Sequence, residues 1–406
     1  MEIDETGRRN RGGQPTPLNQ RLIRRHNGKR ILDAVRHQGP MSRAALAHSS
    51  ELSTPTVCAL VDDLLKRPGL LRRLGKGESS GGRRPLIVDF NEQYGYIAGI
   101  DIGSRSLRFA LADLRGKIVH RGERRTPAGS RDAILDAISD GVGALFREAS
   151  IDSGKLFAIG AGAPGMTDVL AGRVINAVNL KGWTDVPLRQ ILHDRFNVPV
   201  CIDNDVNMAA LGEVWRGCAS DHRNFVFIAL GAGVGAGIVL DGKLHRGSRW
   251  YAGEISHMHL DYRGWDVDDG QQGFLESRAG AEAIARRGRK VRARRGASVS
   301  ADEAARVFEA ARIGDERAAR LVNDVAIYLG TAVANITTLL DPELVVFGGG
   351  IAHVGEQLFA PLRAVVSRIV PNAPEIRLTA LGDDAQLFGS VYSALQLAEV
   401  RLFESL

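Results

Sequence analysis

The sequence predicts an α/β protein of more than one domain, in which a small, basic, helical module precedes a larger body. The chain has 406 residues, and at roughly 100–200 residues per domain this length predicts two or three domains. Residues 1–90 contain 17 Lys and Arg against 9 Asp and Glu, whereas residues 91–406 contain 36 against 38. From about residue 94 onward, apolar segments typical of strands alternate with amphipathic helical segments, as in layered α/β folds.

Composition and cysteine usage exclude several classes of protein. No apolar run reaches the roughly 18–20 residues that cross a bilayer, and the charged N-terminus lacks the apolar core of a secretory signal. The three cysteines, Cys58, Cys201 and Cys218, are odd in number and widely spaced, which indicates neither a disulfide framework nor a metal site. We therefore expect a cytoplasmic protein without membrane association.

The first 66 residues predict a short arm followed by three helices. Residues 1–20 are polar and without periodicity, so we expect a disordered basic arm. Apolar residues at helical spacing follow over residues 27–35, and Gly39-Pro40 ends that helix. Ser42 is suited to cap a second helix, and Ser53 begins a third that has a proline in its first turn.

A predicted β-hairpin completes this module. Residues 70–74 and 85–90 are short β segments on either side of a Gly- and Ser-rich turn. Three helices and such a hairpin describe a winged helix-turn-helix DNA-binding domain, which we assign to residues 21–90. Its third helix is expected to enter the major groove, and arginines of the wing the minor groove. The expected DNA contacts are Arg43, Ser53, Thr54, Thr56, Arg83 and Arg84. The alternatives are a basic segment that only aids solubility and a hairpin that only turns the chain.

The body predicts two lobes built from strands and helices. Two helices are expected at residues 131–149 and 206–215, and the C-terminal third is mostly helical. The expected strands are 96–102, 107–113, 117–124, 157–162, 198–203, 224–230, 234–240 and 344–347. Over 300 residues this alternation indicates two lobes. Whether the lobes are a diverged duplication is not visible in the sequence.

Four Gly-rich or acidic segments of the body are typical of a phosphate-binding fold. Residues 99–105 and 231–237 are Gly-rich turns after strands, and residues 348–350 are three consecutive glycines after another strand. Backbone N–H groups in such turns bind phosphate. Between them, Asp203-Asn204-Asp205 follows a strand and opens a helix, where a carboxylate can act as a base toward a sugar hydroxyl.

These segments, in this order, resemble the ROK family, which comprises bacterial sugar-responsive repressors and sugar kinases. The similarity extends from about residue 20 to about residue 400, and the winged module resembles the repressor branch. It implies a two-lobed actin-like ATPase or hexokinase-like fold for residues 91–406, with a C-terminal helix that returns to the first lobe. It also implies sugar contacts from a turn at Gly162 and from Asn204, Asp205, Glu254, His257 and Glu276. In the kinases of the family the residue that matches Asp205 is the catalytic base.

The sequence departs from the family at its zinc motif. The family pattern is a histidine followed by C-x-C-G-x-x-G-C, and the cysteine positions here are Val267, Asp269 and Phe274. Valine and phenylalanine cannot ligate zinc, so we expect no structural metal. A different metal site is the alternative, and its ligands would come from His257, His259, Asp266, Asp268 and Asp269.

The phosphate loops depart from the kinase pattern as well. The kinases have Asp-x-Gly-Gly-Thr, whereas this chain has Ser104 and Arg105 after Gly103, and it has Ala232 where a threonine is usual. The changes add a Cβ where backbone approaches phosphate and remove two hydroxyl donors. We therefore expect a degenerate nucleotide site and no cofactor. Its residues would be Asp101, Gly103, Gly231, Gly233 and Gly349.

The sequence thus predicts a sugar-responsive transcriptional regulator, a repressor, without a catalytic residue. We expect operator DNA and a small sugar as partners, and a homodimer or homotetramer because operator symmetry requires two winged domains. One alternative is an ATP-dependent sugar kinase that retains a DNA-binding domain and uses Asp205 as its base. Another is an adaptor whose winged module binds protein. The sugar itself is not identified, since xylose, glucose, N-acetylglucosamine and chito- or cello-oligosaccharides suit the same polar residues.

Overall fold

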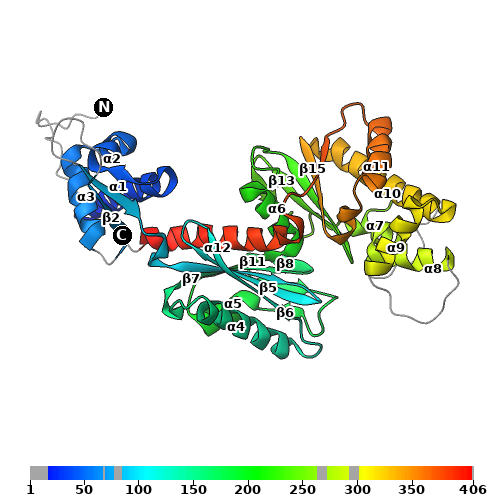
Figure 1. The fold of residues 1–406 in the computed structure, drawn as a ribbon, viewed down its shortest axis with the longest axis horizontal. Helices are drawn as coiled ribbons and strands as arrows, with labels where there is room; N and C mark the ends of the chain where they lie inside the picture. The colour runs from blue at the N-terminus through cyan, green and yellow to red at the C-terminus, as the bar shows by residue number, and fades with distance from the viewer. Residues whose placement is uncertain (1–16, 67–68, 77–84, 263–271, 292–300, 405–406) are drawn as a thin grey trace, which may run out of the picture. The chain divides into compact units, whose positions relative to one another are not determined.

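The structure, a computed structural model, contains two compact units (Figure 1). It describes residues 17–66, 69–76, 85–262, 272–291 and 301–404. The first unit comprises Met1–Tyr96, Asp113–Arg115 and Ala398–Leu406, and the second comprises Ile97–Ala112 and Gly116–Leu397. The strand β5 and the helix α12 therefore each have residues in both units, and each unit is described separately below.

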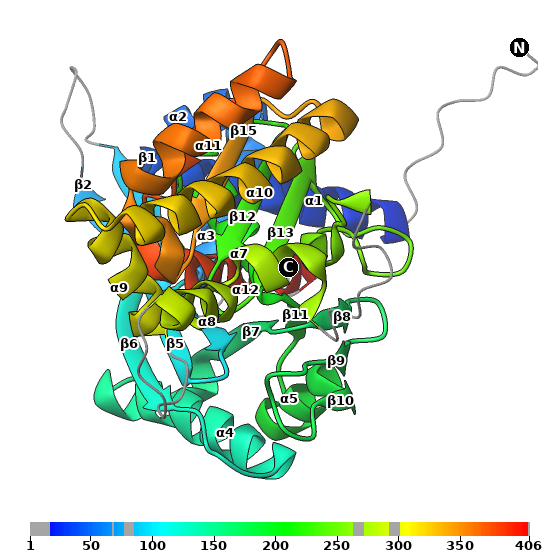
Figure 2. The same ribbon diagram turned by 90° about the vertical axis from the view of Figure 1, so that its right-hand side faces the viewer.

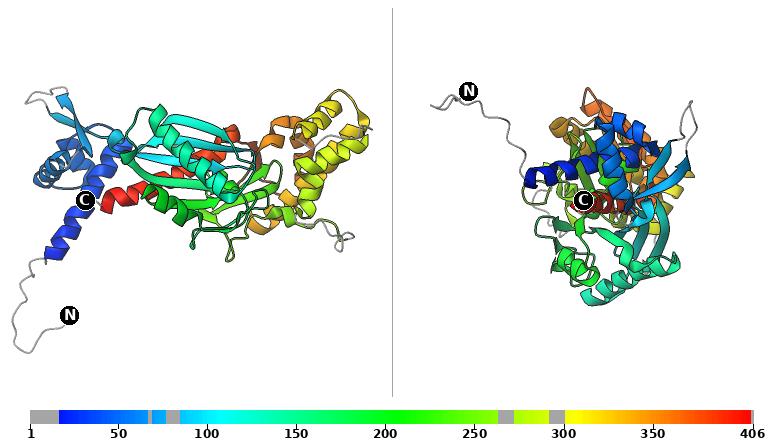
Figure 3. Two further views of the ribbon diagram at one scale, coloured as in Figure 1. Left: turned by 90° about the horizontal axis from the view of Figure 1, so that it is seen from below. Right: turned by 90° about the vertical axis from the view of Figure 1, so that its left-hand side faces the viewer.

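The first unit contains three helices and an antiparallel hairpin, as the sequence predicts (Figure 3). The helices are α1 (Pro17–Gln38), α2 (Arg43–Ser50) and α3 (Thr54–Lys66). The strands are β1 (Met41–Ser42), β2 (Leu71–Lys76) and β3 (Leu86–Phe90), in the order β1-β3-β2. The fold class of a winged helix-turn-helix followed by an α/β body is therefore confirmed.

Local sequence accounts for two of these helices. The Ser42 hydroxyl accepts a hydrogen bond from Ala45 N at 3.1 Å, so it caps α2. The helix α3 buries Val57, Leu60, Val61 and Leu64, the apolar face that its spacing predicts. In contrast, α1 begins at Pro17, so residues 17–20 are helical and not part of a disordered arm. The rest of that arm, residues 1–16, lies outside the described residues.

The first lobe of the second unit is a five-stranded sheet between two layers of helices (Figure 1). Its strands are β4 (Tyr96–Ile102), β5 (Ser106–Asp113), β6 (Ile118–Arg125), β7 (Leu156–Ala163) and β11 (Val200–Asn204). The helices α4 (Arg131–Glu148) and α5 (Leu188–Phe196) cover one face, and α12 (Ala385–Glu404) covers the other. A Cβ at Gly160 would lie 2.0 Å from the Ser390 carbonyl oxygen, so glycine lets α12 approach this sheet closely.

The second lobe contains the other five-stranded sheet, packed against long helices (Figure 2). Its strands are β12 (Phe225–Leu230), β13 (Val234–Leu240), β14 (Lys243–His245), β15 (Leu344–Gly348) and β16 (Glu375–Leu378). The remaining α-helices are α6 (Asp205–Arg216), α7 (Phe274–Ala279), α8 (Ala281–Val291), α9 (Ala301–Arg312), α10 (Glu316–Leu340) and α11 (Glu356–Ile369). In the described part of the chain, no helix combines the length and the apolar character that a membrane span requires.

The remaining elements are a small sheet and short 3₁₀ helices. One three-stranded sheet has the order β10-β9-β8. Its strands are β8 (Met166–Asp168), β9 (Arg173–Asn176) and β10 (Thr184–Val186). Short 3₁₀ helices are η1 (Glu92–Tyr94), η2 (Ser153–Lys155), η3 (Ile255–His257), η6 (Gly350–Val354) and η7 (Gly382–Asp384).

The two lobes repeat one topology. The first sheet has the order β11-β7-β4-β5-β6 and the second β14-β13-β12-β15-β16. We number the five strands of each lobe from 1 to 5 in chain order. The first sheet, taken from β6 to β11, and the second sheet, taken from β14 to β16, then both have the order 3-2-1-4-5. The turn after β4 and the turn after β12 are therefore equivalent positions, and they are the first and second Gly-rich segments of the sequence. The repetition favours the duplication that sequence alone does not reveal.

Candidate functional site

Asp205 is the centre of a group of carboxylates in the second unit. It is the first residue of α6, directly after β11, and its Oδ1 accepts a hydrogen bond from Val206 N at 2.9 Å. Burial and, to a smaller extent, the negative charges of Asp101 and Glu254 together raise the pKa of Asp205 to about 7. Three carboxylates from different elements therefore face one another here.

Glu254 and His257 enter this group from the segment that contains η3. Burial raises the pKa of Glu254, and the neighbouring His257 opposes that shift. Gly253 has a φ of +96°, and a Cβ there would lie 1.9 Å from the Ala236 carbonyl oxygen on β13. Glycine therefore allows the chain to pass against β13 and positions Glu254 beside the other carboxylates.

Glu276 belongs to the same group and lies on α7. Its Oε2 accepts a hydrogen bond from Val234 N at 3.0 Å. Burial raises the pKa of Glu276 to about 6, with smaller contributions from Glu282 and Glu254. A Cβ at Gly233 would lie 2.9 Å from that same oxygen, so the second Gly-rich turn lies directly against Glu276.

Asn204 lies next to this group and already makes several hydrogen bonds. Its Oδ1 accepts from Val206 N at 2.9 Å and from Asn207 N at 3.1 Å, which caps α6. Its Nδ2 donates to the Gly165 carbonyl oxygen at 3.0 Å. The amide thus joins α6 to the β7–β8 turn, and one N–H is left for a ligand.

Gly162, in contrast, does not lie in a turn, which corrects the prediction for this residue. It is a buried position inside β7, and a Cβ there would lie 3.2 Å from Met208 Cγ and 3.4 Å from Ser390 Oγ. It therefore lies against the side chains of α6 and α12. Of the six sugar contacts expected from sequence, the structure brings Asp205, Glu254, His257 and Glu276 together and leaves Asn204 adjacent.

Asp203 supports this site through a partner that the sequence did not indicate. It is 2% exposed, and its Oδ2 accepts hydrogen bonds from Arg246 Nε at 2.8 Å and Nη2 at 2.7 Å. Its Oδ1 accepts from Asn204 N and Asn207 Nδ2. Arg246 follows β14 in the second lobe, so this ion pair joins the two lobes beside Asp205. The sequence around Arg246 contains no motif that would predict its ion pair with Asp203.

The first Gly-rich loop does not fit a magnesium nucleotide. Asp101 is 4% exposed, and its Oδ2 accepts two hydrogen bonds from Arg108, from Nε at 2.9 Å and Nη2 at 2.5 Å. Burial raises the pKa of Asp101, whereas the Arg108 charge lowers it. The Gly103 N–H donates to the Ser106 carbonyl oxygen at 3.0 Å. The carboxylate that would face the metal is neutralised by an arginine, and the glycine N–H is already used within the turn.

The second and third loops lie close to each other. The Gly231 N–H donates to the Gly233 carbonyl oxygen at 2.9 Å. Gly349 has a φ of +87°, and a Cβ there would lie 2.5 Å from the Leu230 carbonyl oxygen. The structure thus brings Gly349 to the end of β12, beside the second loop. Both positions require glycine for backbone packing, which by itself does not indicate a nucleotide.

Phe274 packs as a core residue at one of the family's zinc positions. Its ring centroid lies 4.2 Å from that of His259 and 5.9 Å from that of Tyr328. Among the residues that the structure describes, no group of three His, Cys, Asp or Glu side chains could hold a metal ion. Asp266, Val267, Asp268 and Asp269, which belong to the zinc pattern or to the alternative metal site, lie outside the described residues.

The expected DNA contacts of the first unit gather at the start of α3. Ser53 and Thr54 are exposed and Thr56 is partly exposed, and the Ser53 and Thr56 hydroxyls are 2.8 Å apart. Arg43 forms an ion pair with Asp62, so α2 and α3 are joined by that side chain. The wing arginines Arg83 and Arg84 lie outside the described residues.

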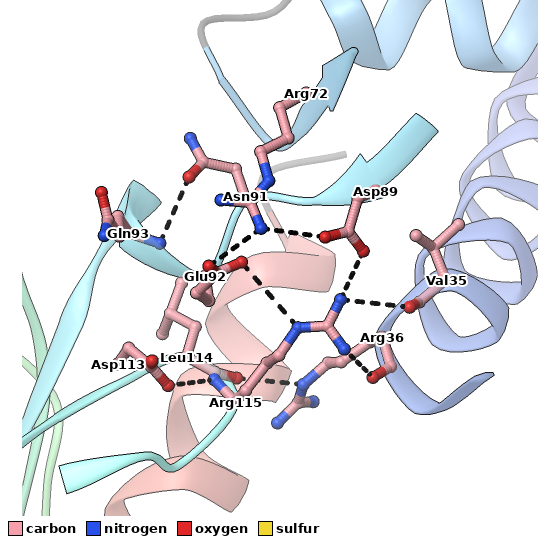
Figure 4. Close-up of polar contacts among 10 residues, drawn as sticks. All are labelled: Val35, Arg36, Arg72, Asp89, Asn91, Glu92, Gln93, Asp113, Leu114 and Arg115. Carbon is pink, nitrogen blue, oxygen red and sulfur yellow. Dashed lines mark hydrogen bonds and ion pairs between the residues drawn. The ribbon is translucent and has the colours of Figure 1, made fainter. Parts of the chain in front are cut away.

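A buried arginine organises the other side of the first unit (Figure 4). Arg36 on α1 is 9% exposed. Its Nε donates to the Leu114 carbonyl oxygen at 3.1 Å, and its Nη1 lies 2.6 Å from Glu399 Oε1. Arg115 supports it, because Arg115 Nη1 donates to the Arg36 carbonyl oxygen at 2.7 Å and Nη2 to Asp89 Oδ1 at 2.6 Å. The helix α1 is therefore held by the turn after β5 and by the end of α12.

The same two elements, β5 and α12, are joined at their other ends by Arg108. Arg108 on β5 binds Asp101 directly, and its Nη2 also donates to Gln386 Oε1 in the first turn of α12 at 3.3 Å. Arg108 thus joins β5 to α12 beside the carboxylate group, and Arg36 binds the turn after β5 and the end of α12 within the first unit.

Comparison with known proteins agrees with the resemblance seen in the sequence. Residues 97–397 match the model of the ROK family. The chain is 31% identical over 356 residues to the putative xylose repressor of Caldicellulosiruptor sp. (strain Rt8B.4), which covers 86% of this chain and 89% of that protein. The aligned region of 356 residues is longer than residues 97–397, and the chain has nine residues after residue 397. The alignment therefore extends into the winged unit.

A kinase and a solved regulator are also similar to this chain. The glucokinase of Halalkalibacterium halodurans is 34% identical over 308 residues, with 72% of this chain and 93% of that protein covered. The crystal structure of a ROK family transcriptional regulator, a homolog of the E. coli MLC protein, superposes with a TM-score of 0.76 at 23% identity, over 94% of this chain and 98% of that one. At that identity the superposition establishes the fold alone.

Proposed function

This chain belongs to the ROK family, and we propose that it is a sugar-responsive transcriptional repressor whose effector binds at the Asp205 group and releases operator DNA. It is a regulator and not a sugar kinase. The repressor relatives are similar over the winged unit as well as the body, and the nucleotide loop is occupied by the Asp101–Arg108 pair.

The observation that carries this proposal is the pair of contacts made by β5 and α12. Arg108 of β5 binds both Asp101 and Gln386 of α12 beside the site, and the turn after β5 and the end of α12 both bind Arg36 of α1. A ligand can shift an equilibrium only if it binds one state more tightly than the other. A sugar that prefers one arrangement of Asp101 and Arg108 would bias β5 and α12, and through Arg36 it would bias the winged unit.

The chemistry of the site supports a polyol ligand. Asp205, Glu254 and Glu276 supply acceptors, and the free N–H of Asn204 and the ring of His257 supply donors. A sugar hydroxyl needs both kinds of partner. Xylose comes first in a ligand panel because several relatives are named xylose repressors.

Effector affinity is expected to depend on pH between about 6 and 8. Sugar hydroxyls that donate to Asp205 stabilise its ionised form, so binding lowers a pKa that is about 7 in the free protein. Affinity should therefore rise with pH up to about 7 and then level off, by at most about tenfold per pH unit. Isothermal titration calorimetry across this range measures it, and a flat profile would contradict hydroxyl donation to an ionised Asp205.

The DNA contacts are proposed for the start of α3 and for the wing. Ser53, Thr54 and Thr56 would face the major groove, and Arg83 and Arg84 the minor groove. Arg43 would contact the backbone only in competition with Asp62. Recognition of a symmetric operator requires two winged domains, so we propose a homodimer as the binding species.

The double variant Arg83→Ala, Arg84→Ala is expected to bind operator more weakly and with less salt dependence. Each phosphate contact that is lost removes about 0.9 from the slope of log K against log salt concentration. Two arginines therefore correspond to a decrease of up to about 1.8. Fluorescence anisotropy with a labelled duplex selected from a random pool measures the slope, and an unchanged slope would exclude the wing as a DNA contact.

Sugar phosphorylation is the second candidate function, and one observation favours it. The pKa of about 7 at Asp205 is well matched to a general base. A coupled assay of ADP release over hexoses, pentoses and N-acetylhexosamines tests this function. We expect no turnover above background, and turnover that Asp205→Asn abolishes would replace the receptor assignment with a kinase.

A further inference from the structure

The loop between β14 and η3 presents two neighbouring aromatic residues beside the carboxylate group. Tyr251 is 47% exposed, so part of its ring is accessible to a ligand. The preceding residue, Trp250, has a φ of +60°. A bulky side chain rarely adopts this left-handed conformation, which persists only where the surroundings enforce it.

Both ends of this loop are anchored in the site. At its start, Arg246 forms the ion pair with Asp203, and its carbonyl oxygen accepts a hydrogen bond from Ala252 N at 3.3 Å. At its end, the Gly253 carbonyl oxygen accepts a hydrogen bond from Ala236 N at 2.8 Å. The loop that contains Tyr251 is therefore fixed at one end by Asp203, next to Asn204, and at the other by Gly253, next to Glu254.

Tyr251 contacts the site residues and is more exposed to solvent than Glu254. Its ring stacks on His257 with 6.1 Å between centroids and 29° between the ring planes. Its carbonyl oxygen accepts a hydrogen bond from Glu254 N at 3.3 Å. Burial raises the pKa of Tyr251, and the charge of Glu254 raises it further. The partly buried part of the site thus contains the carboxylates of Asp205 and Glu254. Its exposed part contains the aromatic ring of Tyr251.

We propose that Tyr251 is an aromatic platform for a second sugar ring, so that the preferred effector is a disaccharide or another glycoside and not a free monosaccharide. The inference rests on the proposed sugar site. The carboxylates would bind the hydroxyls of the inner ring, while the C–H face of the outer ring would lie on Tyr251. Carboxylates alone provide no apolar surface for such a face, and an aromatic ring does.

The test compares matched ligand pairs on the full-length protein. The pairs are xylose with xylobiose, glucose with cellobiose, and N-acetylglucosamine with its β-1,4-linked disaccharide. Calorimetry on the wild type, Tyr251→Ala and Tyr251→Phe gives the ratio of the two dissociation constants for each pair. Leu339→Ala on α10, also an exposed apolar side chain, is the matched control.

For at least one pair, the wild type is expected to bind the disaccharide about tenfold more tightly than the monosaccharide. Tyr251→Ala should reduce this ratio to about one with little change for the monosaccharide, while Tyr251→Phe and Leu339→Ala keep it. If the wild type binds a monosaccharide but the ratio is the same in Tyr251→Ala, the platform is excluded and the sugar site stands. If the wild type binds no ligand of any pair, both proposals fail.

Discussion

The Asp205→Asn variant is expected to bind the effector about 10- to 100-fold more weakly than the wild type while it retains operator affinity. A hydrogen bond to a charged group contributes about 1.5–3 kcal/mol, and the amide replaces the charged acceptor with a neutral one. The winged unit contains no part of α6, so DNA binding should persist. Calorimetry with the effector and anisotropy with the operator measure the two affinities. Unchanged effector affinity would remove Asp205 from the site.

The same variant is expected to be more stable than the wild type above pH 7. The pKa of Asp205 is raised to about 7 in the folded protein from its ordinary value of 3.8. Such a group favours the folded state below pH 3.8, and this contribution is lost as the pH rises through 7. Asparagine removes the cost of the buried charge, so its melting temperature should exceed that of the wild type by a few degrees at pH 8 and show little difference near pH 4.

Asp203→Asn is the matched control for this effect. Asp203 lies two residues earlier in the chain and is also a buried carboxyl group, but it accepts two hydrogen bonds from Arg246. Its loss leaves a partly buried guanidinium without its counter-charge, so this variant should be less stable than the wild type at both pH values. A gain in stability at pH 8 for both variants would mean that general charge reduction, and not burial at Asp205, explains the result.

The Glu399→Gln variant is expected to bind both effector and operator but to lose most of the coupling between them. Glu399 is the residue by which α12 holds Arg36, at 2.6 Å. Its charge-assisted contact contributes about 1.5–3 kcal/mol, comparable with the 1–3 kcal/mol typical of coupling between sites. In this variant, saturating sugar should therefore change operator affinity by only about a few-fold. Glu51→Gln breaks the exposed pair with Arg30 and should leave coupling unchanged. Equal coupling in both variants would exclude Arg36 as the link.

Much of the fold could be predicted from local sequence. The strand β4 is buried at every position, so its apolar segment could be recognised as a strand. The start of α2 could be predicted because Ser42 is a typical helix-capping residue. The start of α1 was missed because its first residues are polar and lack periodicity. The repeated 3-2-1-4-5 order was invisible, since strand order depends on pairing between segments that are far apart in the chain.

The site could be predicted only where a residue's role is local. The run from Asp203 to Asp205 was identified because it follows a strand and opens a helix, whereas Glu254 was expected only from the family resemblance. Gly162 was wrongly expected in a turn, because glycine inside a strand also serves close packing, here against Met208. Arg108 and Arg36 were missed since their partners Gln386 and Glu399 are hundreds of residues away in sequence. The link between site and winged unit depends on those long-range contacts.

The most direct test of the central claim is operator affinity of the wild-type protein with and without the bound sugar. A thermal-shift screen first identifies a sugar that binds, because any ligand of the folded state raises the melting temperature. Anisotropy with the selected duplex should then give a dissociation constant that is about 5- to 150-fold higher at saturating sugar. A sugar that raises the melting temperature but leaves operator affinity unchanged would contradict the account.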